Sequence, residues 1–289
     1  MNILVIGHNS FIGKKYLNKV RKKNKILLIN NKFNKNDIYF FSNERFYQKY
    51  FSKFYLKADI SINFLYIFNS PEEKKINILL IKKIVFSLKR LKVKKNIYIS
   101  SVNSYKKSIY NYGKIKYLCE QYYKLLKNFI IVRPSTVIVF NKKTKMLFGG
   151  QGGKSLNLIN LIIDKFFVFP IFGKGNFLHT FCFLDDLINF LSLISFRSYF
   201  NNKITNFFSG EYINYLDFIK FIMEIKKTKR INIHFPLFIF KFLGYLLKLL
   251  FSNRSLFLER LNNLMSQRIE NNLMPSISKK IKIHTTTQY

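Results

Sequence analysis

A tyrosine and a lysine that lie four residues apart, Tyr112 and Lys116, form the pattern with the clearest chemical meaning in this sequence. At that spacing both side chains lie on one face of a helix. An ammonium group beside a phenol lowers the pKa of the phenol, so Tyr112 can exchange a proton with a hydroxyl or carbonyl group. Ser101 ends an apolar run and can hold the same oxygen atom. Ser101, Tyr112 and Lys116 are therefore the candidate catalytic residues.

A turn with two glycines, Gly7 to Gly13, follows the first apolar run of the chain. Gly7 permits a tight turn, the small Ser10 lets the backbone approach a pyrophosphate, and Gly13 lets a helix pack closely on a sheet. Backbone N–H groups at the start of that helix would face the anion. The expected phosphate-binding residues are Gly7, Ser10, Phe11, Ile12 and Gly13. A tight turn without a ligand is the alternative interpretation.

Short apolar runs alternate with helical periodicity in the first half of the chain. The expected strands are Asn2–Ile6, Lys25–Asn30, Asp59–Phe64, Asn96–Ser100 and Phe129–Arg133. Helices are expected after Gly7, over Pro71–Leu91 and from Tyr112 to Lys127. This alternation is typical of an α/β protein with a doubly wound parallel sheet. The catalytic residues and the glycine turn would then lie at the ends of strands of one sheet.

Beyond Pro134 the alternation becomes less regular. A glycine-rich loop is expected over Gly149–Gly153, and the C-terminal third is expected to be mostly helical. Helices are also expected over Leu156–Phe166 and Asp185–Ser195, with a strand over Phe177–Phe183. The sequence thus predicts a dinucleotide-binding domain over residues 1–148 and a smaller, mostly helical substrate-binding region over 149–289.

The formal net charge of +36, from 50 basic and 14 acidic residues, is of the size seen in nucleic-acid-binding proteins. The lysines, however, are spread along the chain rather than gathered in one stripe, and only nine of the 50 basic residues are arginine. A dedicated nucleic-acid function is therefore the less favoured interpretation. Cys119 and Cys182 lie in apolar surroundings without metal-ligand spacing, so we expect buried, unreactive thiols and no bound metal.

The strongly apolar stretch Ile231–Phe251 raises the question of membrane contact. Lys241 and Lys248 interrupt it, and a spanning helix needs about 20 apolar residues with few charges. The two lysines share one helix face, so a surface helix is expected. It either packs on the substrate-binding region, which we favour, or makes a peripheral contact with the inner face of a membrane. The N-terminus lacks the features of a signal peptide, and a cytoplasmic location is expected.

Taken together, these motifs resemble the extended short-chain dehydrogenase/reductase family, the NAD-dependent epimerase/dehydratase group that acts on nucleotide sugars. The resemblance covers roughly residues 1 to 220. It rests on GHNSFIG at the glycine turn, ISSVNSY, YGKIK with Glu120, VRPSTV and FCFLDDL. The GGQGG loop with PIFGKGNF is similar to a branch attached to surface-polysaccharide synthesis.

The resemblance implies a Rossmann-type fold, to which later parts of the chain return. It also implies that Lys116 contacts the nicotinamide ribose, that Asp186 is structural, and that Asn77 matches a family asparagine. The residues expected to border the nicotinamide are Arg133, Pro134 and Ser135. Those expected at the substrate are Ser101, Asn103 and His179. The apolar faces of the helices over Pro71–Leu91 and after Tyr112 commonly form a homodimer in this family.

Several positions depart from the family pattern. Leu65 and Tyr66 replace alanines beside the cofactor, where their bulk would crowd it unless the loop shifts. His179 stands where relatives often carry an arginine for the substrate diphosphate. After the second strand, Asn30 and Lys32 provide no acid for the ribose of NAD, and Lys32 can pair with a 2′-phosphate. The cofactor is expected to be NAD or NADP, with NADP slightly favoured.

The sequence thus predicts an NAD(P)-dependent 4-epimerase or 4-keto reductase of a nucleotide sugar, with UDP as the expected nucleotide. Tyr112, Lys116 and Ser101 would assist hydride transfer at a sugar carbon. Two alternatives stay open. One is a non-catalytic, nicotinamide-cofactor-binding assembly subunit, and the less favoured one is a basic nucleic-acid-binding protein.

Overall fold

The computed structural model describes residues 2–21, 24–29, 58–68, 72–108, 111–141, 146–149, 154–209, 213–236 and 238–239. Asn30 and Lys32, expected at the cofactor ribose, lie outside these ranges. The described chain forms two compact units. The first comprises Met1–Ser135 with Leu184–Phe207, and the second Thr136–Phe183 with Phe208–Tyr289. The boundary expected near residue 148 therefore falls inside the second unit, because the chain crosses from one unit to the other after Ser135.

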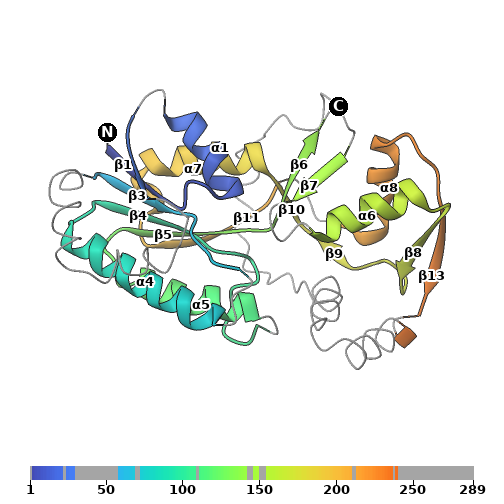
Figure 1. The fold of residues 1–289 in the computed structure, drawn as a ribbon, viewed down its shortest axis with the longest axis horizontal. Helices are drawn as coiled ribbons and strands as arrows, with labels where there is room; N and C mark the ends of the chain where they lie inside the picture. Colours follow the sequence, from blue (N-terminus) through green and yellow to red (C-terminus); the bar gives the residue numbers. More distant parts are fainter. Residues whose placement is uncertain are drawn as a thin grey trace. The chain divides into compact units, whose positions relative to one another are not determined.

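The first unit is built on a six-stranded sheet in which every pair of neighbouring strands is parallel (Figure 1). Its strands are β1 (Asn2–Ile6), β2 (Lys25–Ile29), β3 (Ile60–Asn63), β4 (Lys95–Ile99), β5 (Phe129–Pro134) and β11 (Lys203–Phe207). They lie in the order β11-β5-β4-β3-β1-β2. The chain runs from β1 to β2 on one side and then returns to β3 on the other. This reversal is the switch point at which doubly wound folds bind ligands.

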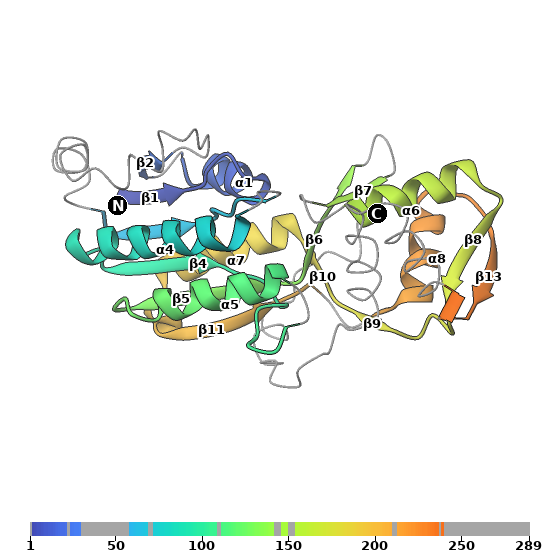
Figure 2. The same cartoon turned by 60° about the horizontal axis from the view of Figure 1, so that its bottom comes forward.

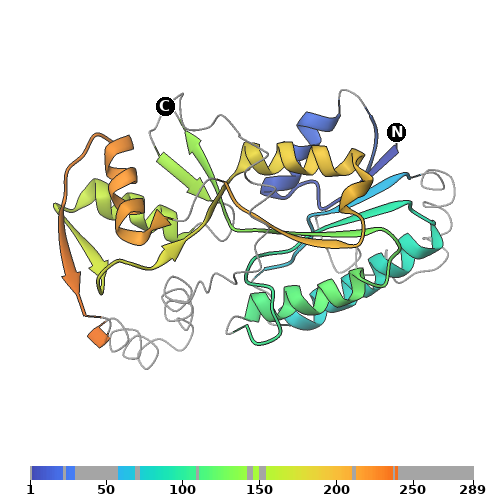
Figure 3. The same cartoon turned by 180° about the vertical axis from the view of Figure 1, so that it is seen from behind.

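The central strands are buried because helices cover both faces of the sheet. Helices α1 (Phe11–Val20) and α7 (Leu184–Phe196) lie on one face, and α4 (Glu73–Arg90) and α5 (Asn111–Tyr123) lie on the other (Figures 2 and 3). Every side chain of β3 is buried, and so is each one from Ile3 to Ile6. The expected strands and helices of this unit therefore form close to their expected bounds.

The second unit contains short strands around two helices, α6 (Lys154–Lys165) and α8 (Tyr215–Ile225). Its strands are β6 (Thr136–Asn141), β7 (Met146–Gly149), β8 (Val168–Phe172), β9 (Leu178–His179), β10 (Phe181–Phe183), β12 (Ile213–Asn214) and β13 (Ile231–Phe235). They pair as β10-β6-β7, β12-β9 and β13-β8. In its described residues this unit is thus not mostly helical, contrary to expectation, because strand pairing with distant segments decides the state of short apolar runs.

The sequence predicts a helix over the apolar stretch Ile231–Phe251, but the first residues of this stretch form a strand. Residues Ile231–Phe235 form β13, which pairs in parallel with β8 (Figure 2). Phe177–Phe183 is likewise divided into two strands at Thr180. Among the residues that the structure describes, no helix is long and apolar enough to cross a membrane. Lys241 and Lys248 lie outside those residues.

Candidate active site

The turn between β1 and α1 depends on both of its glycines. Gly7 adopts a positive φ of 79°, which favours glycine. A Cβ atom on Gly7 would lie 2.7 Å from the backbone nitrogen of Leu65, and one on Gly13 would lie 2.6 Å from the carbonyl oxygen of Gly7. The turn is therefore packed backbone against backbone, at the point where the ends of β1 and β3 meet.

Ser10 fixes the start of α1. Its hydroxyl accepts a hydrogen bond from the backbone N–H of Gly13 at 3.0 Å, as an N-cap does. The N–H groups of Phe11 and Ile12 also belong to the first turn, which carries no acidic side chain. A helix start of this kind at a switch point fits the pyrophosphate of a dinucleotide. The expected residues Gly7, Ser10, Phe11, Ile12 and Gly13 are thus brought together in one turn at the start of α1, and their binding of a phosphate stays a prediction.

The three expected catalytic residues also lie together. Ser101 follows β4, and Tyr112 and Lys116 lie on successive turns of α5. Ser101 and Tyr112 are joined by a side-chain hydrogen bond. The Nζ atom of Lys116 donates to the carbonyl oxygen of Ile99 at 2.8 Å. The fold therefore places a hydroxyl, a phenol and an amine at the carboxyl end of β4.

The electrostatics of this group differ from the expectation that Lys116 lowers the pKa of Tyr112. Burial raises the pKa of the Tyr112 phenol, and the hydrogen bond to Ser101 only partly opposes this effect. Burial also lowers the pKa of Lys116 to about 8. Desolvation disfavours the charged form of each group, and it is the largest cause of both pKa shifts. In this conformation burial is therefore the main cause of the raised pKa of Tyr112, and its activation by Lys116 stays a prediction.

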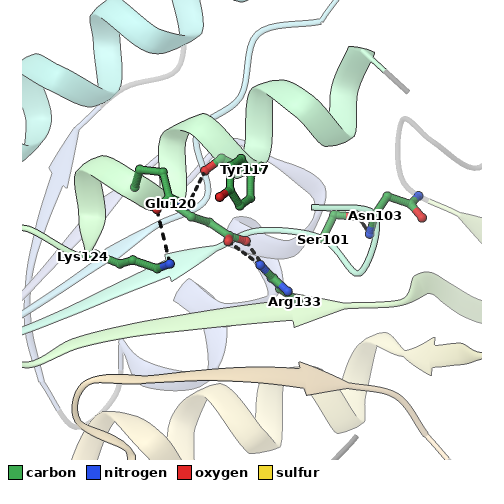
Figure 4. A network of polar contacts seen from close by, with 7 residues as sticks. Ser101, Asn103, Tyr117, Glu120, Lys124 and Arg133 are labelled. Carbon is green, nitrogen blue, oxygen red and sulfur yellow. Dashed lines mark hydrogen bonds and ion pairs between the residues drawn. The ribbon is translucent and has the colours of Figure 1, made fainter. Parts of the chain in front are cut away.

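Arg133 is bound to Glu120 through two hydrogen bonds, which Figure 4 shows beneath α5. The distances to the two carboxylate oxygens are 2.9 and 2.6 Å, and the Glu120 side chain is completely buried. This two-point pairing ties β5 to α5.

Pro134 ends β5, and the N–H of Ser135 donates to the carbonyl of Phe207. That Arg133, Pro134 and Ser135 border a nicotinamide stays a prediction.

The remaining expected site residues have different surroundings. Asn103 lies on the loop after β4, and its N–H donates to the Ser101 hydroxyl at 3.3 Å (Figure 4). The Asn77 side chain forms hydrogen bonds with both the N–H and the carbonyl of Ile67, at 2.9 Å each, and so ties that segment to α4.

Asp186 is buried in the first turn of α7. His179 belongs to β9, and its side chain lies outside the described part.

A cluster of aromatic side chains adjoins the catalytic group and was not identified from the sequence. The Tyr66 ring meets the Tyr112 ring edge to face at 4.8 Å, and Phe68 stacks on Tyr112 at 5.7 Å and contacts Tyr66 at 4.6 Å. The Tyr66 hydroxyl donates to the Glu73 carboxylate at 2.6 Å. The sequence gives one indication of this cluster, which is that Tyr66 is a large residue at a position where the resembled family usually has an alanine. Leu65, by contrast, is buried in the hydrophobic core beneath α4 and α5.

Comparisons with known proteins place this geometry in a defined fold. No family model and no curated protein matches the sequence. Among solved structures, the UDP-glucose 4-epimerase of Thermotoga maritima with UDP-glucose is similar at a TM-score of 0.62 and 19% identity, over 82% of this chain and 86% of that one. The dTDP-4-dehydrorhamnose reductase of Bacillus anthracis with NADP matches at 0.61 and 16%, over 81% and 84%.

A third similar structure is the UDP-glucuronic acid 4-epimerase of Bacillus cereus with NAD. It matches at a TM-score of 0.59 and 19% identity, over 82% of this chain and 87% of that one. At such low identity the likeness establishes the fold. The expected α/β fold, a Rossmann-type doubly wound parallel sheet, is therefore confirmed, and it is the fold of NAD- and NADP-bound nucleotide-sugar epimerases and reductases.

Proposed function

We propose that this chain is an NAD(P)-dependent enzyme that transfers hydride at a sugar carbon of a nucleotide sugar, as a 4-epimerase or a 4-keto reductase. The observation that carries the proposal is the placement of Ser101, Tyr112 and Lys116 at the end of β4, in the same sheet as a glycine turn suited to a pyrophosphate. Similar solved structures bind NAD, NADP or UDP-glucose, which supports the same classes of cofactor and substrate here.

The roles of the residues follow from their chemistry. When bound, the nicotinamide accepts or supplies the hydride. Tyr112 takes the proton of the sugar hydroxyl during oxidation and returns a proton during reduction. Ser101, hydrogen-bonded to Tyr112, holds the sugar oxygen in line with the phenol. Lys116 binds the ribose and, in its charged form, stabilises the phenolate.

The loop after β4 favours hydride transfer over elimination of water. Elimination requires an acid to protonate the departing hydroxyl and a base to remove a proton from carbon. The segment from Val102 to Ser108 contains no carboxylate and no histidine. An epimerase or a reductase therefore fits the loop better than a dehydratase does.

A homodimer through α4 and α5 belongs to this proposal. The described residues of this face expose Leu79 on α4 at 39%, Phe86 on α4 at 65% and Leu125 beyond α5 at 58%. Burying such a patch is the usual reason for association. Sedimentation analysis should give a dimer, and Phe86→Asp should shift it towards the monomer. A wild-type monomer at micromolar concentration would contradict the dimer.

We propose a cytoplasmic location, a role in polysaccharide synthesis and a peripheral contact with anionic membranes. The second unit supports the membrane contact with exposed Phe166, Phe167 and Ile231 beside Lys165 and Arg230. Apolar insertion and charge attraction act together at such a surface. Co-sedimentation with phosphatidylserine vesicles should be salt-reversible and weaker in Phe167→Ser. Absence of binding at low salt would exclude the contact.

A second candidate function is that of a non-catalytic, cofactor-binding subunit. It is favoured by the burial of Lys116, which is only 3% exposed and so has little surface for a ligand. The two candidates differ in turnover rather than in cofactor binding. A nucleic-acid-binding role has no comparable support in the fold.

The test is to identify nicotinamide cofactor released from the purified protein by mass spectrometry and to assay UDP-sugars for turnover. Tyr112→Phe should fold and bind cofactor but lose roughly 10²–10⁴-fold in turnover, as loss of a general acid–base does. Tyr122→Phe, a change on the same helix away from Ser101, is the matched control. Near-full activity of Tyr112→Phe would contradict the assignment. Cofactor binding without any turnover would favour the second candidate.

A further inference from the structure

The ammonium group of Lys116 is enclosed by three tyrosine rings. Its Nζ atom lies 4.9 Å from the ring centre of Tyr66, 4.8 Å from that of Tyr98 and 5.9 Å from that of Tyr112. Cation–π attraction holds an ammonium in such a cage. A bound ligand could reach Lys116 only if one of these rings moved aside.

Tyr66 is the ring placed to move. Tyr98 belongs to β4, is completely buried and stacks on Tyr123 at 4.6 Å, so the sheet holds it. Tyr112 is part of α5. Tyr66 lies on the segment between β3 and α4 and is only partly buried. Rotation of its side chain would uncover Lys116 without disturbing a helix or a strand.

Among the described residues, the hydroxyl of Tyr66 in its closed position donates a hydrogen bond to Glu73 at 2.6 Å, and the Tyr66 ring faces the Lys116 ammonium. A hydrogen bond to a carboxylate is stronger than one between neutral groups. Burial and the contact with Glu73 raise the pKa of Tyr66, so its hydroxyl stays protonated and keeps donating. The backbone next to it is fixed, because Asn77 binds both polar groups of Ile67. Opening is therefore a rotation of the Tyr66 side chain rather than a movement of the loop.

We propose that Tyr66 is a gate over Lys116, closed by its hydrogen bond to Glu73, which the nicotinamide riboside of the cofactor must displace in order to bind. This inference rests on the proposed function, because it concerns the regulation of the same site. Cofactor affinity is then reduced by the fraction of molecules in which the gate is open. The gate also explains why the ammonium group of Lys116 is desolvated in this structure. When Tyr66 moves aside, solvent returns to the ammonium group and favours its charged form.

The first test is a titration of the full chain with NADH and with NADPH, monitored by nicotinamide fluorescence. Tyr66→Ala should bind its preferred cofactor about tenfold more tightly than the wild type, the factor expected if the gate is open about one tenth of the time. Tyr66→Phe, which keeps the ring and loses the bond to Glu73, should fall between them. Tyr122→Ala is the matched control, because Tyr122 also lies beneath a lysine, Lys82, at 5.3 Å. Unchanged or weaker binding by Tyr66→Ala, with the wild type binding, overturns the gate and leaves the proposed function standing.

The second test does not depend on cofactor binding. Acetic anhydride at limiting concentration should acetylate Lys116 slowly in the wild type and at least about tenfold faster in Tyr66→Ala, as measured by peptide mass spectrometry, with circular dichroism confirming that both are folded. The exposed Lys114 should react equally in both and serves as the internal control. If neither protein binds a nicotinamide cofactor, the proposed function fails, and the acetylation rates still decide whether Tyr66 covers Lys116. Equal rates at Lys116 in the two proteins overturn the gate.

Discussion

Replacing Lys116 with methionine should stabilise the fold at neutral pH while abolishing the proposed activity. Burial lowers the pKa of Lys116 from its ordinary 10.5 to about 8. At pH 7 the folded protein therefore carries a buried charge that the unfolded chain holds in water at no cost. Each tenfold change in proton affinity is worth about 1.4 kcal/mol, so the buried charge costs about 3 kcal/mol.

The sign of the pH dependence follows from proton binding. Below pH 8 both states hold the proton and the full cost is present. Between pH 8 and 10.5 the unfolded chain keeps the proton that the folded protein releases, so the free energy of unfolding rises with pH. Methionine fills a similar volume without charge but loses the hydrogen bond to Ile99, worth about 1 kcal/mol. Lys116→Met should therefore be about 2 kcal/mol more stable at pH 7 and no more stable than the wild type above pH 10.5.

The assay is urea unfolding of both proteins at pH 7, 9 and 10.5, with the difference between them taken at each pH so that titration of other groups cancels. Lys114→Met is the control, because Lys114 lies exposed on the same helix. A surface change of this kind should alter stability by less than about 0.5 kcal/mol at every pH. If Lys116→Met is less stable than the wild type at pH 7, or if the difference does not vary with pH, the account of Lys116 as a costly buried charge is wrong.

Three further outcomes are expected. Gly13→Val should fold, as judged by circular dichroism, but lose nicotinamide binding, because its side chain would press on the backbone of the turn. Unchanged nicotinamide affinity would mean that this turn does not bind the cofactor. Glu120→Leu should lower the free energy of unfolding by about 3–5 kcal/mol by leaving a buried charge unpaired, and adding Arg133→Met should restore most of it; an equally unstable double variant would refute this. Cys119 and Cys182, both buried, should resist alkylation by iodoacetamide until the chain unfolds, and fast labelling of the native protein would show otherwise.

The first unit could be largely predicted from the sequence, because its signals are local. An apolar run ending at Gly7 marks a buried strand, and the periodicity after it marks a helix. The second unit could not be predicted to the same degree. The short run over Ile231–Phe235 is a strand because β8 lies beside it. A segment of this length has no preference strong enough to resist such a neighbour.

The same distinction holds within the candidate site. The spacing of Tyr112 and Lys116 alone determines that they share a helix face, and the glycines from Gly7 to Gly13 alone predict a tight turn between a strand and a helix. Only the tertiary structure decides that Tyr66 closes over Lys116 and that the pKa of Lys116 falls. The spacing of residues determines which side chains share one face of a helix or strand. The burial of a residue depends instead on side chains from segments that are distant in the sequence. Desolvation, and with it the charge of Lys116, is therefore a property of the fold.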